Sequence, residues 1–165
     1  MADKTLTDRL QPSLLDRLTD HEPGSLKERR EDRVIDVARL RDIIQRDLSW
    51  LLNTTNLEST FDPEALPMVA GSVLNYGLSE VSGEFSTARR AELIRASIDR
   101  AIALHEPRII PGSVDVTLAA DDNKGSMTVA LDIRADMWAK PLPLELYLRS
   151  VVDVTTGEVA VERRL

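Results

Sequence analysis

Every second residue from Met127 to Met137 is apolar, without a break. A two-residue period places one side of an extended segment on a hydrophobic core, so this stretch predicts a β-strand. Shorter alternations occur at residues 114–118, 144–148 and 152–154, and again at 159–161. Turn-forming residues interrupt them at 122–125, at the prolines near 141–143 and at 155–158. The second half of the chain therefore predicts three or four antiparallel strands joined as a meander.

Before Pro107 the apolar residues recur every three or four positions, which is the period of an amphipathic helix. Helices are expected at about 34–52, 62–77 and 87–105, and Pro107 is expected to end the third. Helices followed by strands in this order predict an α+β fold. Three helices should pack on one face of a three- to four-stranded antiparallel meander sheet.

The details of the first two helices can also be predicted. Trp50 is expected in the core near the end of the first helix. In the second, Asp62 can cap the helix, Pro63 suits its first position, and Gly77 can end it. Its buried side is expected to consist of Leu66, Val69, Val73 and Leu74.

Composition restricts the classes of function. The chain has 165 residues with 21 basic and 28 acidic side chains, a net charge of −7, which disfavours a general nucleic-acid binder. It has no cysteine, so neither disulfides nor thiolate zinc sites are expected. Its two histidines and seven glycines form neither a metal motif nor a phosphate loop, so no metal or cofactor is expected. Without a signal peptide or an apolar span in the sequence, a cytoplasmic protein with no membrane insertion is expected.

Residues 1–33 form a polar N-terminal segment ahead of the domain expected at 34–165. Within this segment, Leu14, Leu15 and Leu18 have helical spacing and lie between Pro12 and Pro23. So short an amphipathic piece is not a stable helix alone in water. Either a groove of a partner protein covers these leucines, or the piece folds back on its own domain.

The most distinctive polar motif is Glu106-Pro107-Arg108 at the junction of helices and strands. A glycosidase needs two carboxylates, and no second acid is an obvious partner for Glu106. A neighbouring cation such as Arg108 favours the ionised form of a carboxylate, which does not suit a general acid. Pro107 should hold Glu106 extended, so that both charged side chains project to the same side. On spacing alone, a surface ion pair is favoured over a docking site for another protein.

Four stretches in this order resemble the TssE family, a baseplate component of the bacterial type VI secretion system that is similar to the wedge protein of contractile-phage baseplates. They are PSLLDRLTDHEP at 12–23, RDLSWLLNT at 46–54, SVLNYGL at 72–78 and HEPRI at 105–109. The resemblance covers nearly the whole chain. One difference is that relatives often follow LLNT with arginine, where this chain has Thr55 and Asn56.

The resemblance implies a structural part, without enzymatic activity, in a cytoplasmic baseplate docked at the inner membrane. The implied partners are the wedge proteins TssF, TssG and TssK, and the sheath proteins TssB and TssC, whose assembly the protein would seed by exchanging β-strands. Glu106, Pro107 and Arg108 would contact the wedge, with Leu14, Leu15 and Leu18 as a second docking segment. Residues 34–165 would then be the baseplate wedge domain.

Two alternatives to this function stay open. The wider family carries the label "lysozyme-like", which suggests a peptidoglycan-cleaving glycosidase, and a generic soluble adaptor could share the fold. If the protein has the structural role, an exposed edge of its sheet could accept a strand from a partner. The candidate edges are Ser113–Ala119 and Val159–Arg163.

Overall fold

The computed structural model describes residues 12–20, 23–24, 35–80, 87–119, 128–138, 143–153 and 156–163. Its α-helices are α2 (Leu14–Leu18), α3 (Val37–Leu52), α4 (Pro67–Ala70) and α5 (Thr87–His105). Strands β1 (Asp115–Leu118), β2 (Thr128–Met137), β3 (Leu144–Asp153) and β4 (Val159–Arg163) form one antiparallel sheet in the order β1-β2-β3-β4. The predicted α+β class with a meander sheet is confirmed.

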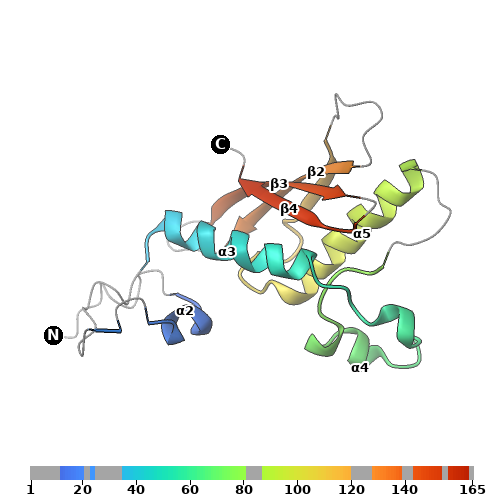
Figure 1. The fold of residues 1–165 in the computed structure, drawn as a ribbon, viewed down its shortest axis with the longest axis horizontal. Helices are drawn as coiled ribbons and strands as arrows, with labels where there is room; N and C mark the ends of the chain where they lie inside the picture. The colour runs from blue at the N-terminus through green and yellow to red at the C-terminus, as the bar shows by residue number, and fades with distance from the viewer. Residues whose placement is uncertain are drawn as a thin grey trace.

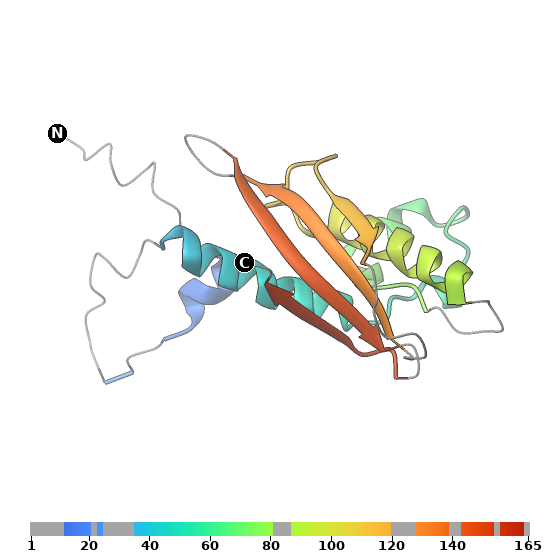
Figure 2. The same ribbon diagram turned by 90° about the horizontal axis from the view of Figure 1, so that it is seen from above.

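The two long helices cover one face of the sheet. Helix α3 lies along β4 and α5 along β1 (Figures 1 and 2). Their apolar sides share a single core with the inward residues of the strands, which include Leu131, Ile133 and Leu148, each with no exposed surface. Ser150, also fully buried on β3, interrupts the apolar pattern. The predictions for Met127, Val154 and the turn at 122–125 lie outside the described residues.

Helix α3 begins three residues later than predicted, because the Asp36 carboxylate accepts the Arg39 backbone N–H at 2.7 Å and caps it. Val34 lies outside the described residues. The prediction that Trp50 is in the core is wrong, since its side chain is 51% exposed. Trp50 lies beside the apolar stripe of the helix, where the Arg46 guanidinium covers its ring at 4.8 Å.

The prediction of a second helix at 62–77 is wrong. Residues 62–77 contain only α4 and a 3₁₀ turn at Val73–Asn75. The Asp62 side chain accepts the Glu64 N–H at 3.0 Å in a local turn, and Pro67 begins α4 because proline restricts the residue before it. Of the four residues expected on the buried side, three are exposed: Leu66, Val73 and Leu74. The fourth, Val69, is half-buried.

Gly77 has a structural role other than the predicted helix end. Its φ of +122° is in the left-handed region, and a Cβ there would lie 2.2 Å from the Thr54 carbonyl oxygen. The backbones of the two segments meet here, with Leu78 N–H donating to Thr54 O at 2.7 Å and Asn56 N–H donating to Leu78 O at 2.9 Å. Only glycine allows so close an approach.

The third helix and the sheet edges agree with the sequence. Helix α5 has the predicted bounds and buries Ile94, Ile98, Ala101 and Ile102. Strands β1 and β4, which lie within the two candidate edge segments, are the two edges of the sheet.

Candidate functional site: an ion-pair network at the Pro107 turn

The chain turns sharply where α5 ends. Glu106 N–H still donates to Ile102 O at 3.0 Å, and Ile109 N–H then donates to Glu106 O at 3.1 Å. Pro107 and Arg108 thus occupy the two corner positions of a β-turn, where proline is favoured at the first. The two charged side chains do meet, but a turn rather than a run of extended backbone brings them together.

Glu106 and Arg108 form a tightly bonded pair. Arg108 donates from Nε to Glu106 Oε1 at 2.6 Å and from Nη2 to Oε2, and its backbone N–H reaches Oε1 at 3.1 Å. Glu106 is only 6% exposed, whereas the Arg108 side chain is 27% exposed. The pair therefore is not a simple surface ion pair, because its acid is buried and its base reaches the surface.

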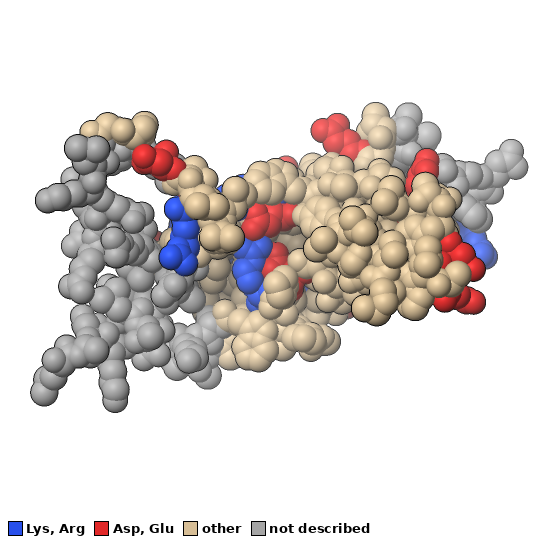
Figure 3. All heavy atoms as spheres, turned by 90° about the horizontal axis from the view of Figure 1, so that it is seen from below, with Lys and Arg blue, Asp and Glu red and all other residues tan. Residues whose placement is uncertain are grey.

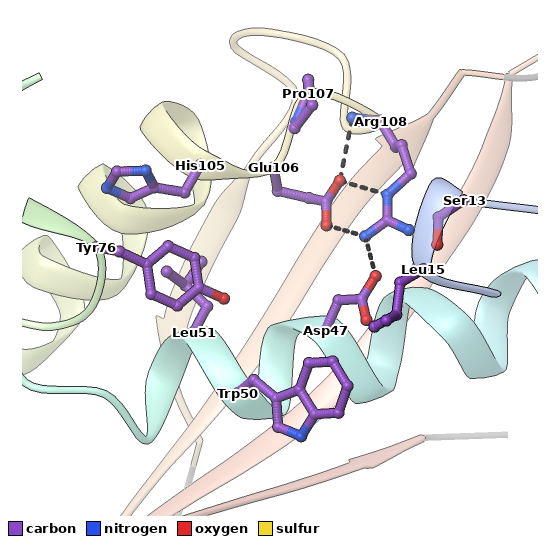
Figure 4. A pocket seen from close by; sticks show the side chains of 10 residues that line it. All are labelled: Ser13, Leu15, Asp47, Trp50, Leu51, Tyr76, His105, Glu106, Pro107 and Arg108. Atoms are coloured by element: carbon purple, nitrogen blue, oxygen red, sulfur yellow. Dashed lines mark hydrogen bonds and ion pairs between the residues drawn. The ribbon is translucent and has the colours of Figure 1, made fainter. Parts of the chain in front are cut away.

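Helix α3 supplies a second acid to Arg108. Asp47 Oδ2 accepts from Arg108 Nη2 at 2.7 Å, while Asp47 Oδ1 accepts from the neighbouring Arg46 through Nε at 2.9 Å and Nη2 at 2.7 Å. Asp47 thus bridges two guanidinium groups. Its bond to Arg108, drawn in Figure 4, connects the Pro107 turn to α3.

Helix α2 joins the same set of charges through Asp16. Its carboxylate accepts two bonds from Arg46, at 2.6 Å from Nη1 and 3.2 Å from Nη2, and a hydrogen bond from the Ser13 hydroxyl. The leucines of α2 stay outside: Leu14 is 70% exposed, Leu18 75% and Leu15 49%. No residue of α2 is buried, so the polar face of this short helix contacts α3 while its apolar residues remain uncovered.

We call Asp16, Arg46, Asp47, Arg108 and Glu106 the ion-pair network. Acids and bases alternate along it, so each charged group is hydrogen-bonded to one of opposite charge. The hydrogen bond from Arg46 holds the pKa of Asp16 below its ordinary value, and the same bond raises the pKa of Arg46. Burial opposes the charge of Arg108, but the bonds from Glu106 and Asp47 outweigh it and raise its pKa. With three acids and two bases, the network has an excess of one negative charge.

A groove of about 410 Å³ opens beside the network (Figure 4). It is lined by Ser13, Leu15, Asp47, Trp50, Leu51, Tyr76, His105, Glu106, Pro107 and Arg108. Burial, followed by the nearby Asp47 and Glu106 charges, raises the pKa of the Tyr76 hydroxyl. The groove thus combines aromatic and apolar walls with fixed charges, which suits a protruding side chain or a peptide segment.

The chemistry of the network is ion pairing. Both oxygens of Glu106 and both oxygens of Asp47 accept hydrogen bonds from arginine, so the two carboxylates are occupied by the protein's own bases. Among the described residues, no group of three or more metal-ligating side chains comes together. The arrangement favours a preformed binding surface over an acid–base pair.

Sequence reasoning found Glu106, Pro107 and Arg108 but missed Asp16, Arg46, Asp47 and Trp50. The opposite charges of Arg46 and Asp47 beside an exposed tryptophan were visible in the sequence. Their connection to Arg108 was not, because it depends on how α3 crosses the end of α5.

Comparisons with known proteins agree with the sequence resemblance. The family model described as "Baseplate wedge protein gp25" matches residues 38–142, which include nearly all of α3 and the whole of α4, α5, β1 and β2. Neither the curated proteins nor the solved structures yielded a match. Over the described part of the chain, no helix combines the length and the apolar character that crossing a membrane requires.

Proposed function

Because the chain belongs to the family of baseplate wedge protein gp25, we propose that it is a non-enzymatic structural subunit of a type VI secretion baseplate. In this role it joins the wedge proteins TssF, TssG and TssK to the sheath proteins TssB and TssC. It acts in the cytoplasm, at a baseplate docked on the inner membrane. The observation that carries the proposal is the family match across α3, α4, α5 and the first half of the sheet.

The groove beside the ion-pair network is the proposed contact with the wedge. Pro107 is exposed at its rim, and Arg108 retains 27% exposure of its side chain. Leu15 contributes a half-exposed apolar side chain to the same groove, and Leu14 and Leu18 extend that apolar surface along α2. In this arrangement Glu106 holds Arg108 in place, and the exposed neighbours make the contact.

The sheet edges are the proposed contact with the sheath. Strands β1 and β4 each pair on one side only within the sheet. An unpaired strand edge can accept an added strand through main-chain hydrogen bonds. Leu118 on β1 is 45% exposed, so apolar surface is available next to that edge.

Two matched variants of the full chain separate the two contacts. Leu15→Asp should prevent co-purification with TssF, TssG and TssK, because it places a charge in the groove. Leu118→Asp should retain wedge binding and instead reduce sheath assembly, scored by fluorescent TssB in cells. Wedge binding by Leu15→Asp at the wild-type level would refute the groove as the contact, and normal sheaths with Leu118→Asp would refute the β1 edge.

The proposed absence of catalysis has its own test. The purified chain should release no soluble fragments from peptidoglycan. Turnover by the wild type that disappears in Glu106→Gln would instead support the glycosidase alternative.

A further inference from the structure

Residues 54–80, which we call the lobe, lie between α3 and α5 in the sequence and away from the sheet (Figure 1). The interior of the lobe is polar. Asn75 is 2% exposed, donates from Nδ2 to Ala70 O at 3.1 Å, and accepts the Leu57 N–H at 3.1 Å. Asn56 is 9% exposed, and its side chain accepts the Glu58 N–H at 3.1 Å. Hydrogen bonds to these buried asparagines therefore help to organise the segment, alongside the packing of Tyr76 and Leu78 against the core.

Further polar contacts fix the lobe against α5. Glu58 forms an ion pair with Arg100 at 2.6 Å and accepts the Ser79 hydroxyl at 2.6 Å. Ser79 N–H in turn donates to the Ser97 hydroxyl on α5 at 2.9 Å. Together with the close backbone approach at Gly77, these contacts give the lobe one defined shape.

Five large apolar side chains of the lobe are on its outside. The exposed fractions are 85% for Met68, 81% for Val73, 67% for Leu74, 49% for Leu66 and 46% for Leu57. Figure 3, which views the molecule from the side of the lobe, shows a broad area free of Lys and Arg, with mostly acidic side chains and a basic group at its right-hand border. A fixed loop with a polar interior and apolar exterior does not stabilise its own domain through those side chains, which is typical of an interaction surface.

The charges around this surface indicate what it binds. The lobe contains Glu58, Asp62, Glu64 and Glu80 and has no lysine or arginine. Glu58 is paired with Arg100, whereas Asp62, Glu64 and Glu80 are exposed. A complementary ligand needs apolar side chains for the centre and basic side chains for the rim.

We propose that the outer surface of the lobe, formed by Leu57, Leu66, Met68, Val73 and Leu74, binds a basic amphipathic helix of another protein. Such a helix places apolar residues on Met68 and its neighbours and lysine or arginine opposite Asp62 and Glu64. A second copy of this chain fits less well, because it would bring the same acids face to face. The chain's own segment 27–33 does not fit either, since it lacks apolar residues and interleaves three acids with its four bases. This inference is independent of the groove and of the sheet edges.

The test uses the purified full chain and a synthetic amphipathic peptide of leucine and lysine, about 18 residues or five helical turns long. Titration by fluorescence anisotropy should show binding, and amide chemical shifts should change in the lobe. A peptide with glutamate in place of lysine should bind about tenfold more weakly or worse. Met68→Ser/Val73→Ser should weaken binding of the lysine peptide by a similar factor. Both side chains are more than four-fifths exposed, so circular dichroism of this double variant should be unchanged.

Trp138→Ser is the matched control, because Trp138 is 61% exposed directly after β2, outside the lobe, the groove and the two edge strands. It should bind the lysine peptide like the wild type. Equal binding of the two peptides would overturn the proposal, and so would unaltered binding by the double variant or an equal loss in the control. Sedimentation equilibrium tests whether a second copy of this chain binds the lobe instead. A wild-type dimer that becomes monomeric in the double variant would also overturn the proposal.

Discussion

Nη2 of Arg108 lies 2.7 Å from Oδ2 of Asp47, although the two residues are 61 positions apart in the chain. The same nitrogen also donates to Glu106, so one guanidinium group serves an acid on its own turn and an acid on α3. Glu106 is nearly fully buried, and water cannot readily replace the guanidinium at its carboxylate. The motif that sequence reasoning assigned to docking thus also holds the fold together.

Arg108→Ala should lower the free energy of unfolding by roughly 3 kcal/mol, the lower end of the loss when one partner of a buried ion pair is removed. The loss is not larger because the Arg108 side chain is still 27% exposed. The variant should therefore still fold, but with lower stability than the wild type. Urea denaturation followed by circular dichroism measures the difference.

Arg134→Ala is the control for this prediction. Arg134 is exposed on β2 and stacks on Tyr147 at 4.9 Å. Its removal should change stability much less than the removal of Arg108 does. Equal losses for the two variants would contradict an internal role for Arg108.

Gly77→Ala should destabilise the protein by more than about 2 kcal/mol, since left-handed backbone strain alone costs about 1–2 kcal/mol and the new Cβ would collide with the Thr54 carbonyl. Gly71→Ala is the matched substitution in the same lobe, where the new Cβ would meet only Pro67 O at an ordinary 3.6 Å. Thermal melting of both variants gives the comparison. If Gly77→Ala melted at the same temperature as the wild type, the close approach of residues 54 and 77 would not be rigid.

Ser150→Ala should stabilise the protein by about 1 kcal/mol, the order of the penalty for a buried polar group without a hydrogen bond. Ser150 is fully buried, and its hydroxyl has no hydrogen-bond partner among the described atoms. Alanine removes that hydroxyl and leaves a void smaller than a methyl group. Denaturant titration checks the sign, and a clear destabilisation would mean that the hydroxyl is satisfied in solution.

The elements that the sequence predicts well are those in which one period runs over many residues. The strand pattern from Val129 to Met137 and the stripe on α5 each repeat often enough to identify both the element and its buried side. The lobe could not be predicted in this way. Its apolar residues at helical spacing face outward, because polar side chains such as Asn75 provide its internal contacts.

The contacts of the candidate site likewise fall into those that the local sequence predicts and those that it does not. Glu106 and Arg108 are neighbours in sequence, so their pairing could be inferred from local geometry. Asp47 and Asp16 reach them only through the packing of α3 on the sheet and of α2 on α3, which no spacing rule contains. Long-range ion pairs of this kind require the tertiary structure.

Asp16→Asn should release α2 from α3, because the bond to Arg46 is the contact that replaces apolar burial for this short helix. A five-residue helix does not persist alone in water, so its amide resonances should move towards random-coil values. Glu92→Gln on α5 removes an exposed ion pair with Arg95 and should leave the α2 resonances unchanged.

Low pH should also release α2 from α3 in the wild-type protein. The Arg46 bond lowers the pKa of folded Asp16 below its ordinary value of 3.8, so the stabilisation is fully present above that value. It is lost as the pH falls through the folded pKa, and α2 should therefore stay attached at neutral pH and detach only below about pH 4. Amide shifts of α2 recorded against pH give the midpoint. Detachment already between pH 5 and 7 would show that a group other than Asp16 controls the contact, and the Asp16→Asn protein should show no such transition at any pH.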